Sequence, residues 1–402
     1  MTSLAAGPWS PLRIGLYRAL WFAALGTNLG SFMHITAAGW SMTLLTDSAV
    51  LVGSVQTMWA VPGFLLALHA GAIADLFDRR TVVMVTHLVA LVIAMSVAML
   101  QWTDQLTPAI LLGGTFLESI ALTVASPAFM ALTPQVVDAP RLRQALALDS
   151  MSRNIAQTVG PALAGVVIAV SNAGAVYVLN GMAFVWVIVL ARSGRLPAYE
   201  STSTNGINAA IGEGVRHILG QAALRNTAIR LMLSNVAVAA VIALLPLAAK
   251  RNIGLEAGGF GLLYAALGAG SVTMVVFLPA LRRVAGEETI ALIATVVWAF
   301  GVAGFALATS LLVALVMLFI AGLGLMALMN VLFTTMISGL ADWVRGRGAA
   351  LAILSAWLGT SIGALMWGII AGATSVTGSL IAAAIVGVTV SLFGRVMLPL
   401  KR

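Results

Sequence analysis

Apolar segments of about twenty residues recur along the whole chain, separated by short polar connections. About twenty residues of α-helix cover the roughly 30 Å hydrocarbon core of a bilayer, so each segment is long enough to span a membrane. The twelve expected spans are Leu20–Leu45, Val50–Leu68, Thr81–Leu100, Ala109–Leu132, Ala145–Val170, Ala173–Ala191, Ile229–Ala249, Gly259–Pro279, Ile290–Leu307, Leu311–Met336, Gly348–Ala371 and Ser375–Val396. The pattern predicts an all-α integral membrane protein with twelve transmembrane helices, the first of which is an internal span and not a cleaved signal peptide.

The scarcity of charge supports this class. Hydrophobic residues make up 61% of the 402 residues and charged residues only 8%, whereas soluble domains carry about 25% charged residues. A soluble fold has too few polar side chains here to cover its apolar surface. Cysteine is absent, which excludes disulfides and thiolate metal sites, and no pair of His residues has metal-ligand spacing. We therefore expect neither a metal ion nor a cofactor.

Basic residues indicate the orientation. If both termini are cytoplasmic, all of the 21 Lys and Arg residues except Lys250 and Arg251 fall on the cytoplasmic side. Such a bias follows the positive-inside rule, and it supports an even number of spans. The net charge of +8 is then better explained by topology than by binding to nucleic acid.

A polar segment near the middle predicts two halves. We expect an N-terminal six-helix half at 1–191, a cytoplasmic linker at 192–228 and a C-terminal six-helix half at 229–402. Three short matches, each separated by about half the chain, support this division. They are Ala145–Ser150 with Ala350–Ser355, Gly160–Gly165 with Gly363–Gly368, and Arg79–Arg80 with Arg282–Arg283.

The connection between the second and third spans reads Gly71-Ala-Ile-Ala-Asp75-Leu-Phe-Asp78-Arg79-Arg80. Gly71 lets its helix come close to a partner, and Asp75 can accept hydrogen bonds at a helix N-terminus, where the dipole favours an anion. We expect Asp78, Arg79 and Arg80 to form an ion-pair cluster. A simpler alternative is that the two arginines only hold the loop in the cytoplasm.

This connection resembles the G-x-x-x-D-x-x-G-R-R motif of the major facilitator superfamily, with Asp78 where the family usually has Gly. The resemblance implies two six-helix halves that rock around a central site by alternating access. It also implies that the loop acts as a gate by latching against the eleventh helix.

A second motif lies in the fifth span. Gly160-Pro161-Ala-Leu-Ala-Gly165 resembles the G-P-x-x-G-G motif of proton-driven exporters. Pro161 removes a backbone donor and bends the helix, while the glycines permit close helix packing. The resemblance implies a barrier against leak. The alternative is a kinked packing helix of the kind that any transporter contains.

Further segments narrow the resemblance to the enterobactin-exporter-like branch and its macrolide-efflux relatives. These segments are Asn28–Gly30, Pro134–Asp138, Arg143–Ser150 and Trp343–Arg347. The branch implies export of a drug, a macrolide or a siderophore in exchange for protons. Together with the short outer connections, it indicates a bacterial inner membrane.

Polar residues at membrane depth are the candidate site, because they are costly in lipid and mark function by default. Glu118, about halfway along the fourth span, is expected to carry protons or to pair with a cationic substrate; the alternative is a neutral acid bonded to a neighbouring helix. His34 is the second candidate because imidazole titrates near neutral pH; the alternative is a membrane histidine that is only hydrogen-bonded. Asn28, Ser31 and His34 recur every three residues and form one polar stripe.

The remaining candidates lie elsewhere on the helices. Asn235 and Asn330 are the main polar residues of the second half, besides Tyr264, and we assign them to the substrate cavity. Asp149 and Arg153 are spaced i, i+4, which brings two side chains together on one helix face and predicts a structural ion pair.

Three functions remain open. The first is proton-coupled export of a small amphiphilic compound by a monomer. The second is import or facilitated uptake of a small metabolite, which the few polar residues of the second half disfavour. The third is a membrane sensor or enzyme, but neither a nucleophile–base set nor a nucleotide-binding G-x-x-x-x-G-K-[ST] loop is visible. We therefore predict a transporter and not an enzyme.

Overall fold

A computed structural model describes residues 7–194, 196, 220–338 and 345–400. The chain divides into two compact units, of which unit 1 comprises Met1–Ala37 and Leu65–Asn205 and unit 2 comprises Ala38–Phe64 and Gly206–Arg402. All regular structure in the described residues is helical, and no strand occurs there. The predicted all-α class is therefore confirmed.

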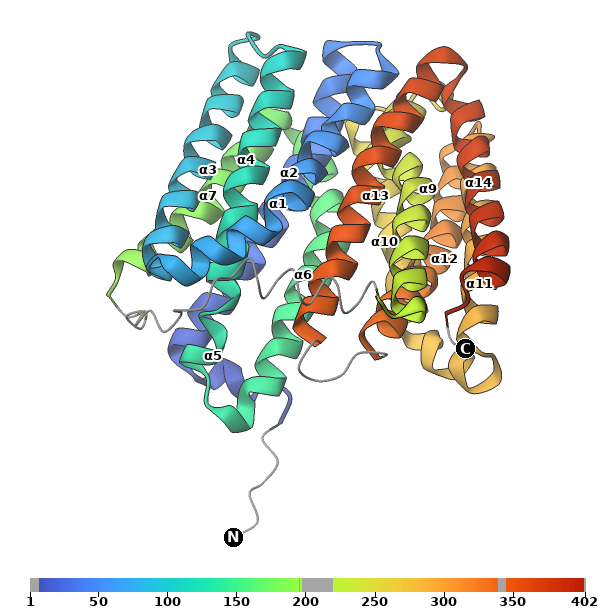
Figure 1. The fold of residues 1–402 in the computed structure, drawn as a ribbon. Coiled ribbons are helices and arrows are strands. Elements are labelled where there is room, and N and C mark those ends of the chain that lie inside the picture. Colours follow the sequence, from blue (N-terminus) through green and yellow to red (C-terminus); the bar gives the residue numbers. More distant parts are fainter. Residues whose placement is uncertain (1–6, 195, 197–219, 339–344, 401–402) are drawn as a thin grey trace. The chain divides into compact units, whose positions relative to one another are not determined.

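The first helices of the chain are α1 and α2, and each contributes residues to both units. Unit 1 also contains a short 3₁₀ helix and the helices up to α7. The bounds are η1 Ser10–Arg13, α1 Gly15–Leu45, α2 Ala49–Leu76, α3 Arg79–Trp102, α4 Pro108–Met130, α5 Thr133–Val136, α6 Ala139–Val170 and α7 Ala173–Arg192 (Figure 1).

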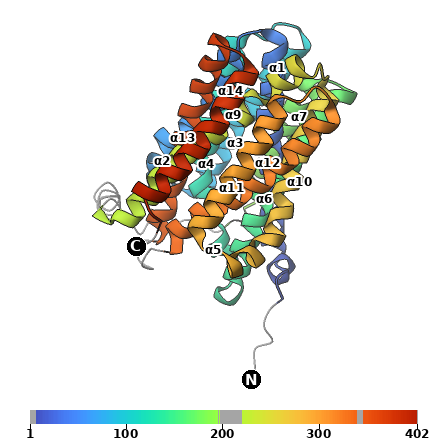
Figure 2. The same cartoon turned by 90° about the vertical axis from the view of Figure 1, so that its right-hand side faces the viewer.

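Unit 2 contains six further long helices. They are α9 Ala222–Asn252, α10 Ala257–Val284, α11 Glu287–Ala306, α12 Leu311–Ser338, α13 Arg345–Ala373 and α14 Val376–Met397 (Figures 1 and 2). The linker residues 197–219 and Trp343 lie outside the described residues. Residues 38–64 belong to unit 2 in space although they precede most of unit 1 in the chain. The six-helix halves at 1–191 and 229–402 stay a prediction.

Eleven helices of the described residues are long and apolar enough to cross a membrane. The sequence predicted twelve spans, and α1 is the one that is missing from this set. Its 31 residues are sufficient in length, but Asn28, His34 and several Ser, Thr and Gly residues lower its mean hydropathy. The count thus agrees approximately with the prediction, and α1 differs because it carries the polar stripe.

Small residues allow the helices of unit 1 to pack closely. Ala90, Ala94, Ala121 and Phe184 form a core cluster shared by α3, α4 and α7. A Cβ added to Gly114 would lie 2.9 Å from a methyl group of Val97, so α4 approaches α3 closely at this glycine. Close packing of this kind supplies the van der Waals contacts on which helix association in lipid depends.

Unit 2 is built around α9, in which 78% of the apolar membrane-spanning segment is buried. Gly359 and Gly363 of α13 lie directly against the backbone of α9. α14 also packs against α9, while α12 packs against both α10 and α11. Pro246 of α9 has no N–H, so the carbonyl of Ile242 loses its helical partner. The hydroxyl of Tyr264 in α10 donates to that carbonyl at 3.2 Å and satisfies it.

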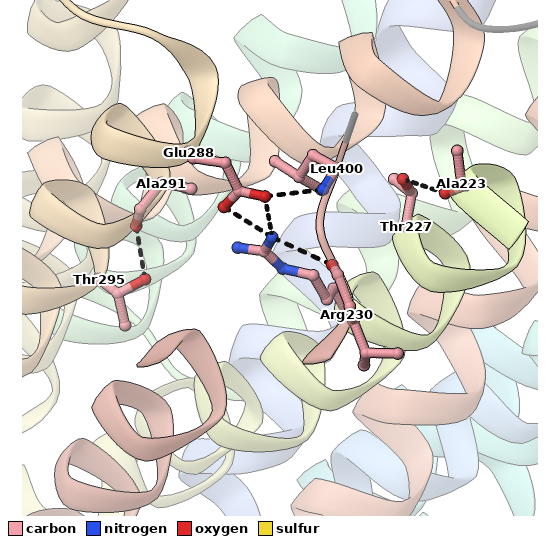
Figure 3. A network of polar contacts seen from close by, with 8 residues as sticks. Ala223, Thr227, Arg230, Glu288, Ala291, Thr295 and Leu400 are labelled. Carbon is pink, nitrogen blue, oxygen red and sulfur yellow. Dashed lines mark hydrogen bonds and ion pairs between the residues drawn. The ribbon is translucent and has the colours of Figure 1, made fainter. Parts of the chain in front are cut away.

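An ion pair between a buried arginine and a partly exposed glutamate holds the end of the chain against unit 2. Arg230 of α9 is 3% exposed, and its Nη1 lies 2.8 Å from each carboxylate oxygen of Glu288 in α11 (Figure 3). The same carboxylate accepts a hydrogen bond of 2.7 Å from the backbone N–H of Leu400, and Arg230 also donates to the carbonyl of Leu398 at 3.4 Å. The Leu400 side chain packs into the core cluster with Leu224. The segment after α14 is thereby fixed to α9 and α11.

Candidate functional site

The structure brings the two leading candidates of unit 1 into contact. Nδ1 of His34 in α1 lies 3.2 Å from Oε2 of Glu118 in α4, and both side chains are completely buried. Ionisable groups at this depth are costly unless they are paired. Each group therefore lowers the cost of burying the other. We call the two residues the His34–Glu118 pair.

Thr115 and Tyr177 surround the imidazole. Thr115 lies one turn before Glu118 on the same face of α4, and its Oγ1 is 3.3 Å from Nε2 of His34. The ring of Tyr177 in α7 meets the imidazole edge-on, with ring centroids 5.2 Å apart. Both ring nitrogens thus face oxygen atoms, and the aromatic contact fixes the plane of the ring.

Asn180 of α7 completes the site. Its Nδ2 donates to Oε1 of Glu118 at 2.8 Å, and its side chain is fully buried. Gly30 makes this possible, because a Cβ at that position of α1 would collide with the Asn180 side chain. The carboxyl group therefore lies between an amide donor and an imidazole.

The sequence analysis missed Asn180 and Tyr177. Asn180 is a lone amide near the middle of an apolar segment, which is the same signal that singled out Glu118. Which partner it takes depends on the packing of α7 against α4 and α1, and this cannot be read from spacing within one helix.

The rest of the polar stripe on α1 does not reach Glu118. Asn28 donates from Nδ2 to Oγ of Ser152 in α6 at 3.3 Å. Ser31 donates to the carbonyl of Thr27 in its own helix at 2.8 Å. His34 is therefore the member of the stripe that joins the candidate site, whereas Asn28 links α1 to α6.

The two asparagine candidates of unit 2 bond locally. Asn235 donates to the carbonyl of Leu231 at 2.8 Å and lies 3.6 Å from the sulfur of Met329. Asn330 accepts from the hydroxyl of Thr334, one turn further along α12, at 3.3 Å. Their part in a substrate cavity stays a prediction.

The connection between α2 and α3 is organised by helix caps. Asp78 is the N-cap of α3 and accepts from the backbone N–H groups of Arg80 and Thr81, each at 3.3 Å, and from the hydroxyl of Thr81 at 2.8 Å. Arg79 donates to the carbonyl of Ala74 at the end of α2 at 3.4 Å. Gly71 lies in α2 with open space where its Cβ would be. Asp75 also lies in α2, but its side chain is outside the described part of the structure.

The contacts of the Arg80 side chain differ from the expected ion-pair cluster. Its guanidinium donates to the carbonyls of Ala191 and Arg192 at the end of α7, where free carbonyls and the helix dipole favour a cation. The guanidinium of Arg80 thus bonds to the end of α7 and not to the Asp78 carboxylate, which accepts from the backbone N–H of Arg80 instead. Whether the connection acts as a gate stays a prediction.

The motif of the fifth span lies in α6, where Gly160, Pro161 and Gly165 are all buried. A Cβ on Gly160 would lie 2.8 Å from the Cβ of Phe32 in α1 and 3.3 Å from the carbonyl oxygen of Leu29. Gly160 therefore permits α6 and α1 to meet closely, as its residue type predicts. The exporter-like role of the motif stays a prediction.

The predicted Asp149–Arg153 ion pair is wrong. Asp149 accepts hydrogen bonds from the hydroxyls of Tyr17 at 3.0 Å and Thr133 at 2.9 Å, whereas the exposed Arg153 donates to Ser150 at 3.4 Å. Burial, together with the nearby Asp149 carboxylate, raises the pKa of the Tyr17 phenol, so it stays protonated and acts as donor. The i, i+4 spacing allows the pair to meet, but an exposed pair gains too little to compete with two hydroxyl donors.

No group of three or more His, Cys, Asp or Glu side chains among the described residues is placed to hold a metal ion. The pair of His34 and Glu118 alone is too small a ligand set for the usual metal sites of proteins.

Solved structures show which class of protein has this fold. A bacterial homologue of the human lysosomal transporter Spinster matches with a TM-score of 0.78 and 12% identity, over 96% of each chain. A nucleoside transporter matches with a TM-score of 0.76 and 13% identity, over 96% of this chain and all of that one. The chain therefore has the fold of a multi-pass membrane transporter.

The family is shown by the sequence profile described as "transmembrane secretion effector", which matches residues 6–401. The chain belongs to this family, and the predicted membership of the major facilitator superfamily is confirmed. The staphyloferrin A transporter of Staphylococcus aureus is 26% identical over 40% of this chain and 41% of its own length. An uncharacterised major facilitator transporter of Sinorhizobium fredii is 26% identical over 63% of each chain. The alignments thus span less than two thirds of these relatives, which are transporters and not enzymes.

Proposed function

We propose that this protein exports a small amphiphilic compound in exchange for protons, and that the His34–Glu118 pair is the proton-binding site. The observation that carries the proposal is the complete burial of a carboxyl group of α4 and an imidazole of α1 whose nearest atoms are 3.2 Å apart. A packing role alone would not require two ionisable groups where an apolar pair would be cheaper. The family description, a secretion effector, favours export over import.

Proton exchange at the pair follows from its chemistry. With one proton the pair is neutral, either as carboxylate and imidazolium or as carboxylic acid and imidazole. Gain or loss of a proton leaves a net charge in an apolar interior, which is unfavourable without a compensating partner. A change in proton number therefore changes the stability of one conformation relative to another, as coupled transport requires.

The cargo is proposed to be only moderately polar. In unit 2, Asn235 and Tyr264 are satisfied by backbone carbonyls of their own unit. A strongly polar nutrient would need several convergent polar groups. A siderophore belongs among the candidates because a relative is named as a staphyloferrin A transporter, and drugs and macrolides remain candidates from the sequence resemblance.

The test is accumulation of a panel of dyes, antibiotics and siderophores in an efflux-deficient bacterial host. Cells with empty vector, wild-type protein, Glu118→Gln and Glu256→Gln are compared with and without a protonophore. Glu256 is the matched control because it is an exposed acid outside the site. We expect the wild type and Glu256→Gln to lower accumulation of at least one compound, and the protonophore or Glu118→Gln to abolish this effect.

Other outcomes redirect the assignment. Export that persists in Glu118→Gln but is lost in His34→Gln would move the essential proton site to the imidazole. A protein that raises accumulation of a compound would instead establish import of a small metabolite, which is the competing function. Equal behaviour of Glu118→Gln and the wild type, both insensitive to the protonophore, would reject proton coupling at the pair.

We further propose that the protein is a monomer in the bacterial inner membrane with both termini in the cytoplasm. The distribution of Lys and Arg supports this orientation. The absence of cysteine permits a direct test, because single cysteines can be introduced without background labelling. Ser171→Cys in the exposed α6–α7 connection should react with a membrane-impermeant maleimide in intact cells, and Phe77→Cys in the exposed α2–α3 connection only after permeabilisation. The reverse pattern would invert the proposed topology.

A further inference from the structure

Unit 2 contains a cavity of about 680 Å³ at the end where α9 and α13 stop and where α2 and α14 begin. Its wall is formed by residues 47–50, 251–252 and 371–377 together with Ile369. A volume in this range is typical of sites for small molecules. Hydroxyl and amide groups, including those of Ser48, Asn252 and Thr374, make this wall polar.

Arg251 provides the positive charge of the cavity. One of its guanidinium N–H groups donates to the carbonyl of Asp47, and the Asp47 carboxylate lies 4.0 Å away. That carboxylate is 90% exposed, and pairs with such exposure contribute little. Within the described part of the chain, Nε and Nη1 of Arg251 have no partner. A planar guanidinium with free N–H groups is suited to bind a carboxylate.

The helix ends around the cavity reinforce this charge. The first turns of α2 and α14 border it at Ala49, Val50 and Val376, and neither first turn contains an acidic residue. The opposing helix C-termini are already satisfied by the chain. At the end of α13, the Ile370 carbonyl accepts from both the N–H and the hydroxyl of Thr374, at 2.9 and 2.7 Å. Ser48 and Ser375 cap these first turns through their hydroxyl oxygens, and Asp47, whose carboxylate is 90% exposed, is the one acid in the wall. The dipoles of the two helix N-termini still favour an anion in the cavity.

The position of Arg251 is also unusual in the sequence. Lys250 and Arg251 are the two basic residues that the predicted topology places outside the cytoplasm. Lys250 has a structural use, because its ammonium group donates to the carbonyl of Thr43 at the end of α1. Arg251 is 41% exposed and lines the cavity, so structure alone does not account for its charge.

We propose that this cavity binds a small-molecule carboxylate, with Arg251 as its cationic partner. The hydroxyl groups of Ser48 and Ser375, which accept in their helix caps, can donate further hydrogen bonds to it. The site shares no residue with the His34–Glu118 pair, and it does not depend on the direction or the coupling of transport.

The experiment is calorimetric titration of the purified full-length protein in lipid nanodiscs with succinate, with uncharged dimethyl succinate and with inorganic phosphate. Arg251→Gln removes the charge, and Ala373→Phe fills the cavity from an exposed wall position. Arg283→Gln and Val284→Phe make the same changes at exposed positions at the end of α10, away from the cavity. Glu118→Gln tests for binding at the buried pair instead.

We expect saturable binding of succinate by the wild type, the two controls and Glu118→Gln. Arg251→Gln should weaken it by about tenfold or more, as expected for loss of a charge-assisted contact, and Ala373→Phe should weaken it to a similar degree. Absence of binding by the wild type, or unchanged binding in both cavity variants, would overturn the proposal. The proposal would also be overturned if dimethyl succinate bound as tightly as succinate, or if phosphate bound more tightly than succinate. Loss of succinate binding in Glu118→Gln alone would contradict it as well.

Discussion

Replacement of Glu288 by alanine is expected to lower the free energy of unfolding by about 3 kcal/mol. The variant leaves Arg230, which is 3% exposed, without its carboxylate partner, and it also removes the acceptor for the N–H of Leu400. Breaking a buried pair from one side is costly because an uncompensated charge stays buried. The measurement is chemical unfolding of the purified protein in detergent micelles.

The neighbouring acid gives a matched control for this experiment. Glu287 and Glu288 are similarly exposed, at 30% and 27%, but Arg282, which pairs with Glu287 at 3.2 Å, is 30% exposed whereas Arg230 is 3% exposed. Glu287→Ala should therefore cost less than about 1 kcal/mol. The double variant Arg230→Met with Glu288→Leu should recover part of the loss, because it removes both charges together. Equal losses in Glu287→Ala and Glu288→Ala would mean that the burial of Arg230 does not determine the stability of this end of unit 2.

Replacement of Asn180 by leucine is the second large effect that we expect. Leucine has a similar size but cannot donate to Oε1 of Glu118, so a fully buried acceptor loses its 2.8 Å hydrogen bond. Leaving such a group without a hydrogen-bond donor costs about 2 kcal/mol, so we expect the free energy of unfolding to fall by that amount. If the proposed function is correct, proton-coupled export should also fall by about tenfold or more, since about 1.4 kcal/mol corresponds to tenfold in an equilibrium.

Two further variants test whether the effect of Asn180→Leu comes from the lost contact with Glu118 or only from the removal of a buried amide. Asn330→Leu removes an amide whose described bond is to Thr334 in its own helix, and it should change stability by less than about 0.5 kcal/mol. A cycle that combines Asn180→Leu with Glu118→Leu should recover stability but not export, because the orphaned acceptor is then absent as well. Full additivity of the two single variants would show that Asn180 and Glu118 do not interact energetically.

The two capping arginines illustrate the limit of reading charge from sequence. The run Asp78-Arg79-Arg80 suggested an ion-pair cluster, whereas Asp78 caps α3. It did not indicate that Arg80 would reach the end of α7, because that contact depends on how α3 and α7 pack. The wrong pairing of Asp149 with Arg153 has the same origin, as the competing donors Tyr17 and Thr133 come from other elements.

The candidate site was predictable in part. Glu118 and His34 were singled out because a polar group in an apolar span is exceptional whatever its neighbours are. Their contact was not predicted, nor was the role of Asn180. Gly30 illustrates the reason. Because glycine has no side chain, α1 can approach Asn180 at this position, but a glycine in one helix does not identify the helix that it contacts.

The sequence by itself determined the helical membrane-spanning class, the approximate number of spans and the buried polar residues that would need partners. These properties follow from hydropathy, which is a local sum over about twenty residues and does not depend on the rest of the chain. Only the tertiary structure decided the partners: His34 with Glu118, Asn180 with Glu118, and Arg230 with Glu288. The reason is physical, because hydrogen bonds and ion pairs act over about 3 Å, and which groups come that close depends on the helix faces that meet in the fold.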